Sequence, residues 1–553
     1  MPPFFKRQKQ KRQKNNEGLS RENQPDSSSK SQVSNRLPKF LTESLSHNLD
    51  VIKQKTGNSP DIIIRILKVG RDPGIRMAIV YVEGIVNGQS IHDFILESIM
   101  ENSTLREKMG AKETLNVLAE DVVALGTVKE ISLWDDLFSS LMSGESVILL
   151  DGIDRGLIAD TKGGEQRSVE EPSSQVTVRG PRDGFTESLR TNTSLVRRRI
   201  QNPDLWMESM KIGKVTKTDV AIMYIKGIAN EEIVEEVRNR LSRINIDSVL
   251  ESGYIEQMIE DQTFTSFPTL YHTERPDSVT GNLLEGRVAI FVNGTPFVLI
   301  APAVFIQFFQ SVEDYYARFD IATALRFLRI LIFFISLVGP SIYIAATTFH
   351  QEMIPTNLLF AVAAQREAVP FPAFVEAVIM EIAFEILREA GIRMPRAVGS
   401  AISIVGALVI GQAAVEAGIV SPAMVIVVAI TAIANFATPS FSIAISARLI
   451  RFLFMLIAAV FGFYGVILGM IMLVVHLCGL RSFGVPYMSP LAPFIPGNND
   501  DTVIRAPWWA FTHRPKMISK GNMVREGKDQ KPKPPESRLM DNDQTQKDDN
   551  DGM

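Results

Sequence analysis

Three glutamates interrupt an otherwise apolar stretch of the chain at residues 371–387. They are Glu376, Glu381 and Glu385, and the last two are four residues apart, so they share one face of a helix. An ionised carboxylate is costly in lipid, and such residues normally face a bundle interior, a water-filled cavity or a partner. The segment is compatible with cation conduction or gating. It is equally compatible with an amphipathic helix at the interface, with its glutamates in head-group water.

A second stretch, Ala397–Val415, is rich in glycine, alanine and serine, which let helices approach one another closely. It carries apolar and then polar candidates for a pore or gate: Val405, Leu408, Val409, Gln412 and, just beyond it, Glu416. A ring of such helices would form an apolar constriction with polar ends, which gates ions by dewetting. The alternative is ordinary packing of small residues inside one bundle.

Residues typical of catalytic and metal sites are sparse. The single cysteine, Cys478, excludes an intrachain disulfide framework and a cysteine-rich metal site. The six histidines are scattered without an HExxH motif, and neither a GxSxG elbow nor a Walker or dinucleotide glycine pattern occurs. We therefore expect no enzymatic activity, no cofactor and no metal. A net charge of -4 gives no support to nucleic-acid binding.

Hydropathy places the membrane-spanning segments in the second half of the chain. A spanning helix needs about 20 mostly apolar residues. Four segments satisfy this clearly: Ile330–Thr348, Ala397–Val415, Val420–Thr438 and Phe452–Cys478. We expect Pro340 and Pro439 to kink or end their helices.

Arginines between the spans indicate their direction, because cytoplasmic loops are enriched in Lys and Arg. The arginines that precede or separate the four spans are Arg318, Arg326, Arg329, Arg388, Arg393, Arg396, Arg448 and Arg451. The loop at 416–421 has neither Lys nor Arg, so we expect it outside. The pattern is consistent only if the chain crosses back before Arg388, which makes the acidic segment 371–387 a fifth span. The side of the C-terminal tail stays open.

The first half of the chain contains an internal repeat. Residues Ala78–Asn87 match Ala221–Asn230 at an offset of 143 residues, and Val147–Gly152 resembles Val288–Gly294 at an offset of 141. Two separate matches with nearly equal offsets indicate a duplication, or at least two similar subdomains. Each unit has a β-rich run, then helical segments, then a hairpin whose turn is Asp151-Gly152 or Asn293-Gly294, residues that suit a type I′ turn.

These patterns predict an α+β/membrane fold class, with two similar α/β subdomains followed by a transmembrane helical bundle. We divide the chain as follows: 1–59 disordered basic tail and lead-in; 60–170 first subdomain; 171–204 linker with a bracing helix; 205–302 second subdomain; 303–329 juxtamembrane; 330–482 transmembrane, about five segments; 483–513 membrane-proximal; 514–553 disordered tail. The basic linker block, from Arg179 to Arg199, is either an anion or partner surface or a brace between the subdomains.

Several long runs of residues resemble the A subunit of the GerA-type nutrient germinant receptors of endospore-forming bacteria. The runs are Arg179–Asn192, Glu251–Gln257, Phe267–Thr269, Thr273–Asp277, Glu285–Ile290, Asp314–Tyr316, His350–Thr356, Arg366–Pro372, Arg388–Arg393 and Val409–Val415. The resemblance covers about residues 60–510, and the two polar tails fall outside it.

The resemblance implies a multi-pass protein of the spore inner membrane. Its partners would be a B-type subunit resembling amino-acid transporters, which binds the nutrient, and a C-type lipoprotein subunit. The A subunit would form a homo-oligomer that acts as a nutrient-gated ion channel and starts germination by cation release. On that model the stretch 405–416 lines the pore, and Glu376, Glu381 and Glu385 are candidates for cation handling.

Two other functions fit the sequence less well. A secondary transporter often carries inverted repeats within the membrane, whereas the repeat found here lies in the soluble half. An assembly scaffold would use the soluble repeats to recruit partners and the membrane half only as an anchor.

Overall fold

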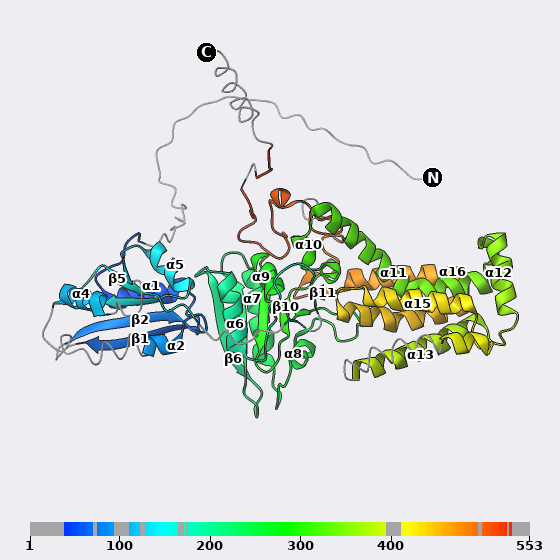
Figure 1. Ribbon diagram of the computed structural model, residues 1–553, viewed down its shortest axis with the longest axis horizontal. Helices are drawn as coiled ribbons and strands as arrows, with labels where there is room; N and C mark the ends of the chain where they lie inside the picture. Colours follow the sequence, from blue (N-terminus) through cyan, green and yellow to red (C-terminus); the bar gives the residue numbers. More distant parts are fainter. Residues whose placement is uncertain are drawn as a thin grey trace, which may run out of the picture. The chain divides into compact units, whose positions relative to one another are not determined.

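Two five-stranded antiparallel sheets and a set of long apolar helices make up the chain (Figure 1). The structure is a computed structural model, and it describes residues 38–69, 74–92, 110–121, 128–163, 171–172, 175–393, 411–495, 500–527 and 530–533. The predicted fold class, two similar α/β subdomains followed by membrane helices, is confirmed.

The first sheet has the strand order β1-β2-β4-β5-β3. Its strands are β1 (Ile62–Val69), β2 (Ile75–Val82), β3 (Val128–Ile131), β4 (Ser146–Leu150) and β5 (Gly156–Ala159). Helices α1 (Leu45–Lys55) and α5 (Trp134–Met142) pack on one face, and α4 (Ala111–Asp121) packs on the other, with the short α2 (Gly88–Ser90) after β2. Strand β2 alternates between the two cores, since Ala78 and Val80 join one and Met77 and Ile79 the other.

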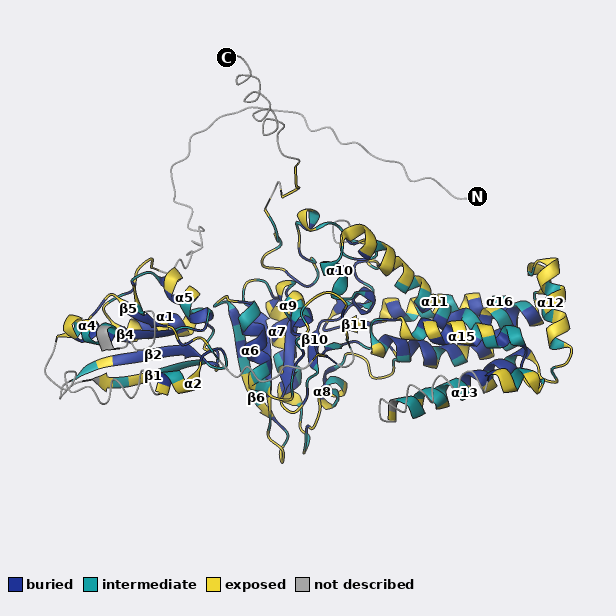
Figure 2. Ribbon diagram, viewed as in Figure 1, coloured by how far each residue is buried: buried dark blue, intermediate teal, exposed yellow. Residues whose placement is uncertain are grey.

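The second sheet repeats the same order as β6-β7-β9-β10-β8. Its strands are β6 (Leu205–Ile212), β7 (Thr218–Ile225), β8 (Tyr271–Thr273), β9 (Val288–Val292) and β10 (Val298–Ala301). The helices are α6 (Leu189–Arg199) and α9 (Pro276–Leu284) on one face, and α7 (Glu231–Arg243) and α8 (Ser252–Ile259) on the other. Strands β2 and β7 start 143 residues apart, as the sequence repeat predicted. Figure 2 shows β10, a central strand of this sheet, in the colour of buried residues.

Each subdomain begins one helix earlier than predicted. The amide nitrogen of Thr42 donates to Asn48 Oδ1 ahead of α1, and that of Thr186 donates to Asn192 Oδ1 ahead of α6. The two helices are therefore equivalent, so α1 belongs to the first subdomain instead of a lead-in, and α6 to the second instead of a linker. The sequence also shows that the two helices are equivalent, because the tetrapeptide Thr-Glu-Ser-Leu occurs at both 42–45 and 186–189.

The predicted type I′ turns are wrong, because only the glycine of each pair has a positive φ. Gly152 has φ +87° and Gly294 has φ +96°, whereas neither Asp151 nor Asn293 has a positive φ. Their side chains instead hold the equivalent helices: Asp151 Oδ1 accepts from the amide of Leu45, and Asn293 Oδ1 accepts from the amide of Leu189. The turn residue of each hairpin thus satisfies an amide at a helix start that would otherwise lack a partner.

The basic linker block acts as a brace between the two subdomains. Arg197 of α6 is 1% exposed, and its Nε and Nη2 donate to the Asp61 carboxylate of the first subdomain at 2.7 and 3.1 Å. Arg198 Nη2 donates to the carbonyl of Gly163 at 2.9 Å. Gly57 meets the second subdomain with φ +65°, where an added Cβ atom would lie 2.2 Å from the ring of Trp206. Of the two interpretations of this block, the contacts support the brace.

A short connection joins the second sheet to the helices of the membrane half. It holds a 3₁₀ turn at Phe305–Phe309 and the helix α10 (Glu313–Tyr316). The helices are α11 (Phe319–Thr348), α12 (Thr356–Arg366), α13 (Ala373–Arg393), α15 (Pro422–Phe436) and α16 (Phe441–Gly479). Within the described residues, α11 and α16 are the two that are long and apolar enough to cross a membrane. Helix α15 is apolar but shorter, and no residue of α12 is buried.

Helix α16 reverses its direction at Gly462, whose φ of +59° and ψ of -145° are not helical. A Cβ atom added at Gly469 would lie 3.0 Å from the ring of Phe454, fifteen residues earlier. A straight helix would separate these residues by about 22 Å, so the two halves of α16 must lie antiparallel. A side chain at Gly462 would also strike the His350 ring, 2.8 Å from an added Cβ, so the reversal requires glycine for both its φ and its space.

Both open ends of this hairpin return to one loop of the second subdomain. The hydroxyl of Ser446, near the start of α16, donates to the carbonyl oxygen of Ser266. His476, near the end of α16, hydrogen-bonds Thr265 at 3.0 Å. The tip of the hairpin, at Gly462, lies against Phe349 at the far end of α11.

The membrane half therefore differs from the predicted spans. The segment Phe452–Cys478 was expected to be one span but contributes to both halves of the hairpin. Arg448 and Arg451 were expected in a loop but lie inside α16, and α11 begins at Phe319 and contains Arg326. A hydropathy scale assigns every arginine the cost of an unpaired charge, and this placed the three arginines outside the helices. In the structure, Arg326, Arg448 and Arg451 each pair with a carboxylate.

The C-terminal segment returns to the second subdomain, so it lies at the same end of the helical bundle as that subdomain. Ser482 Oγ donates to the carbonyl of Thr269 at 2.6 Å. Residues 514–525 were predicted to belong to a disordered tail, but they pack on the same subdomain. Arg514 Nε donates to the Leu284 carbonyl at the end of α9, Ser519 Oγ donates to that of Ile228, and Ile518 is 3% exposed. We predicted disorder from the polar composition of this segment. Its polar side chains instead donate hydrogen bonds to backbone carbonyls of the second subdomain, which hold the segment in place.

Replacing Arg197 by methionine would leave the Asp61 carboxylate buried without its cation. Breaking a buried pair in this way costs about 3–5 kcal/mol, and we expect a loss of that order in the free energy of unfolding of the soluble region, measured by urea denaturation. The matched control is Arg190→Met, because Arg190 pairs with Glu83 at 3.1 Å on the surface. That change should cost less than about 1 kcal/mol. Equal losses would contradict the bracing role.

Glu256 of α8 gives the soluble region a pH dependence. Burial raises its pKa to about 7, with repulsion from Glu260 and Glu251 adding to the effect. The ordinary pKa of a glutamate is 4.5, so the folded chain binds this proton more tightly than the unfolded chain does. The resulting stabilisation is complete below pH 4.5 and is lost as the pH rises to about 7. We expect the melting-temperature gain of Glu256→Gln to grow from about zero at pH 4.5 to a maximum above pH 7. A gain that is constant with pH would contradict this.

Candidate functional site

Pro340 lies inside α11 and leaves one backbone carbonyl without its helical donor. Proline has no N–H, so the carbonyl of Ser336, four residues earlier, lacks its usual partner. Arg451 of α16 supplies the donors instead. Its Nε donates to Ser336 O at 2.7 Å, and its Nη2 donates to Ser336 Oγ at 3.2 Å. The sequence of α11 therefore creates the position that this arginine occupies.

The same arginine pairs with one of the predicted acidic residues. Arg451 Nη1 lies 2.6 Å from Glu381 Oε2, and the two side chains are only 3% and 2% exposed. Helices α11, α13 and α16 thus meet at a single buried charge pair. Each charge needs the other, because an unpaired ion in such surroundings is strongly unfavourable.

The other two glutamates of α13 are also paired. Glu385 contacts Arg448 of α16 at 3.1 Å and Arg388 of its own helix. Glu376 is fully buried, and its Oε2 accepts from the amide and hydroxyl of Ser421 at 2.9 and 2.8 Å.

Ser421 precedes the first residue of α15, so the Glu376 carboxylate lies where a helix dipole favours negative charge. Arg366 of α12 lies 3.4 Å from the other oxygen of Glu376. Glu376 and Glu381 therefore occupy the interior of the bundle, whereas the Glu385 side chain is 29% exposed.

The pore candidates fall partly outside the described residues, and Val405, Leu408 and Val409 lie there. Gln412 and Glu416 are described, both are exposed, and Gln412 Nε2 donates to Glu416 Oε1 at 2.8 Å. A Cβ atom added at Gly411 would lie 3.7 Å from Val425 of α15. The described end of this segment is thus helical, borders α15 and presents polar side chains outward.

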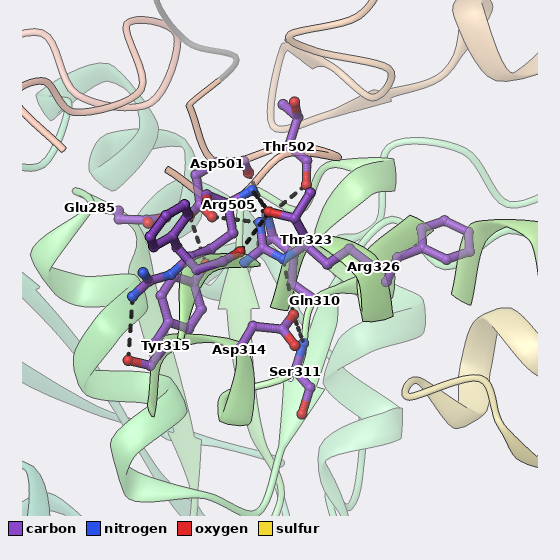
Figure 3. Close-up of polar contacts among 12 residues, drawn as sticks. Glu285, Gln310, Ser311, Asp314, Tyr315, Thr323, Arg326, Asp501, Thr502 and Arg505 are labelled. Carbon is purple, nitrogen blue, oxygen red and sulfur yellow. Dashed lines mark hydrogen bonds and ion pairs between the residues drawn. The ribbon is translucent and has the colours of Figure 1, made fainter. Parts of the chain in front are cut away.

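A second charged cluster fixes the foot of α11, and Figure 3 labels four of its residues, Asp314, Tyr315, Arg326 and Asp501. Asp314 of α10 is 1% exposed and accepts from Arg326 Nε at 2.9 Å and from Arg329 Nη1 at 2.8 Å. Arg326 Nη1 also donates to Asp501 Oδ1 at 2.7 Å, and Tyr315 Oη donates to the other oxygen of Asp501 at 2.7 Å. We call these five residues the foot cluster. It ties α10, α11 and the C-terminal segment together.

The sequence singled out the three glutamates but missed their partners. Arg451 lies in a stretch that is apolar on both sides, and an arginine inside a spanning segment is itself a signal of a buried pair. The assignment of Arg448 and Arg451 to a loop hid that signal. Asp501 carried no local signal, because its arginine partner Arg326 is 175 residues away in the chain.

A duplicated α/β region followed by packed apolar helices, two of them long and apolar enough to cross a membrane, defines a membrane protein with a large soluble region. The chain matches the family model described as Bacillus/Clostridium GerA spore germination protein over residues 50–517. It belongs to this family, as the A subunit of a spore germinant receptor, and the expectation that it is not an enzyme agrees with that family.

Individual relatives match along most of their length. The chain is 60% identical over 515 residues to spore germination protein KA of Bacillus subtilis strain 168, covering 93% of this chain and 94% of the relative. It is 40% identical over 490 residues to spore germination protein B1 of the same organism, covering 88% of this chain and 99% of the relative. It is also similar to the crystal structure of the N-terminal domain of the A subunit of the Bacillus megaterium spore germinant receptor GerK3, at 53% identity and a TM-score of 0.40, covering 49% of this chain and 100% of that one.

Replacing Arg451 by methionine should reduce the amount of folded chain in the membrane, because Glu381 would stay buried without a cation. The double variant Glu381→Gln/Arg451→Met should recover most of the folded amount, since it removes both charges. We would measure the monodisperse fraction of the detergent-solubilised chain by size-exclusion chromatography. The matched control is Arg393→Met, because Arg393 and Glu389 form an exposed pair. Failure of the double variant to improve on the single one would contradict the pairing.

Proposed function

We propose that this chain forms, as a homo-oligomer in the spore inner membrane, a nutrient-gated channel whose opening releases cations and starts germination. The partners proposed for it are a B-type transporter-like subunit that binds the nutrient and a C-type lipoprotein subunit. The relatives named above support the setting, because they are spore germination proteins and one is the A subunit of a germinant receptor.

One observation carries the proposal for the position of the pore. The glutamates of α13 are occupied by arginines and by Ser421 within the same chain, whereas Gln412 and Glu416 are exposed and pair only locally. Among the membrane residues that the structure describes and the sequence singled out, these two present polar groups outward from the bundle. We therefore propose that the segment 405–416 faces the ion path, and that the paired charges of α13 and α16 hold the frame around it.

The gate proposed here is apolar. Val405, Leu408 and Val409 precede Gln412 in the sequence, so a ring contributed by several copies would have an apolar constriction beside a polar end. Such a constriction excludes ions when it loses water and conducts when it widens or becomes more polar. A nutrient opens it only if the receptor binds the nutrient more tightly in the open state.

Spores that carry Val409→Ala should leak potassium, or germinate without nutrient, because a smaller side chain widens the constriction. The measurement is potassium release at normal receptor abundance, checked by immunoblot. The matched control is Ile426→Ala, which shortens an exposed apolar side chain on the neighbouring α15 and should leave release unchanged. Unchanged release in Val409→Ala, and also after substitution of Leu408 and Gln412, would contradict the pore assignment and favour a scaffold.

A further inference from the structure

A cavity of about 370 Å³ lies beside the foot cluster, where the second subdomain meets the segments on either side of the membrane half. Its wall is contributed by α9, by α10 with the residues just before it, and by the C-terminal segment through Trp508 and Arg525. This volume is in the range of sites that hold small molecules. The aromatic side chains Tyr271, Tyr316 and Trp508 supply much of the apolar surface.

The charges around the cavity are unequal. Six arginines interact with three acidic residues: Arg287, Arg326, Arg329, Arg505, Arg514 and Arg525 with Glu285, Asp314 and Asp501. Cations are thus in excess by three in this neighbouring network, while the cavity wall itself holds two arginines, Arg199 and Arg525, and two acidic residues, Asp277 and Glu285. Burial also raises the pKa of Glu285, against the opposing effect of Arg287. Such an excess favours an anion.

Three of the four charged groups in the cavity wall have a partner of their own. Arg199 pairs with Asp183 at 2.6 Å, Asp277 with Arg275 at 2.7 Å, and Glu285 lies 3.6 Å from Arg287.

Arg525 has only a share in an ion pair, because its partner Glu285 lies nearer to Arg287. Its Nη1 is 3.9 Å from Glu285 Oε1, too far for a hydrogen bond, and its guanidinium lies 5.5 Å from the ring centres of Trp508 and Phe511. Within the described part of the chain its guanidinium forms no hydrogen bond, so its donors are available to a ligand.

We propose that this cavity binds a small organic monoanion, a carboxylate on a flat apolar body. Arg525 receives the carboxylate through paired N–H donors, and Tyr271, Tyr316 and Trp508 contact the body. A dianion fits less well, because Glu285 lies close to Arg525. A ligand here contacts both Tyr271 of the second subdomain and Tyr316 of α10, which precedes the foot of α11. The C-terminal segment is held beside it, because Trp508 Nε1 donates to the carbonyl of Tyr315 at 3.2 Å.

The test uses the full chain purified in detergent and three probes of nearly equal shape: benzoate, benzyl alcohol and benzylammonium. We expect benzoate to bind about tenfold or more tightly than benzyl alcohol, as measured by isothermal titration calorimetry, because of the charge-assisted pair. Arg525→Gln should remove this advantage while leaving the elution profile of the protein unchanged. Equal binding of benzoate and benzyl alcohol, or tighter binding of benzylammonium, would overturn the proposal.

A glycine in the wall offers a matched pair of variants that locate the site. Gly281 of α9 lines the cavity, and an added Cβ atom there meets nothing within 4 Å. Gly281→Leu should therefore fill the cavity and abolish benzoate binding, whereas Gly281→Ala should retain it. These variants also correct for benzoate that enters the detergent micelle. Benzoate binding that survives in Gly281→Leu places the ligand elsewhere and overturns the assignment.

Discussion

The ion pair between Arg326 and Asp501 constrains the whole membrane half of the chain. The two residues are 175 positions apart, one at the foot of α11 and the other beyond the last membrane helix, yet their side chains lie 2.7 Å from each other. The chain must therefore return to the side from which α11 departs. The reversal of α16 at Gly462 provides the last return, and it leads the C-terminal segment back to the second subdomain. Without the reversal, Asp314, Arg326 and Arg329 would form a cluster with one carboxylate missing.

The paired charges inside the bundle also depend on one another. Pro340 deprives the Ser336 carbonyl of a donor, Arg451 replaces it, and the charge of Arg451 in turn requires Glu381. Each step is forced by the cost of leaving a polar group unsatisfied in an apolar region. The foot cluster ties α11 to α10 and to the C-terminal segment, and hydrogen bonds from Ser446 and His476 to Ser266 and Thr265 join the bundle to the soluble repeat. This is the kind of connection that gating by a partner subunit would use.

The sequence predicted the soluble half better than the membrane half, for a physical reason. Strands β2 and β7 are nearly identical in pattern because both fill a core, so a fixed offset of 143 residues revealed them. Helices α1 and α6 were assigned to a lead-in and a linker although the repeated Thr-Glu-Ser-Leu was present, because their amphipathic residues look like a solvated helix. In the membrane half, hydropathy cannot register that Arg448 and Arg451 face carboxylates, nor that a single glycine folds α16 back. Those features depend on contacts between residues far apart in the chain.

The return of the chain through α16 is tested most directly by a distance across its hairpin. Spin labels would be placed on Leu453→Cys and Ile471→Cys, two exposed positions, with Cys478→Ser removing the native thiol. A straight helix would separate the two backbones by about 27 Å, whereas packed antiparallel helices lie about 8–10 Å apart. The account predicts strong dipolar broadening in the electron paramagnetic resonance spectrum of the full chain in lipid, at spin separations below about 20 Å. A narrow distribution near or beyond about 27 Å would contradict it, and with it the position of Asp501 beside Arg326.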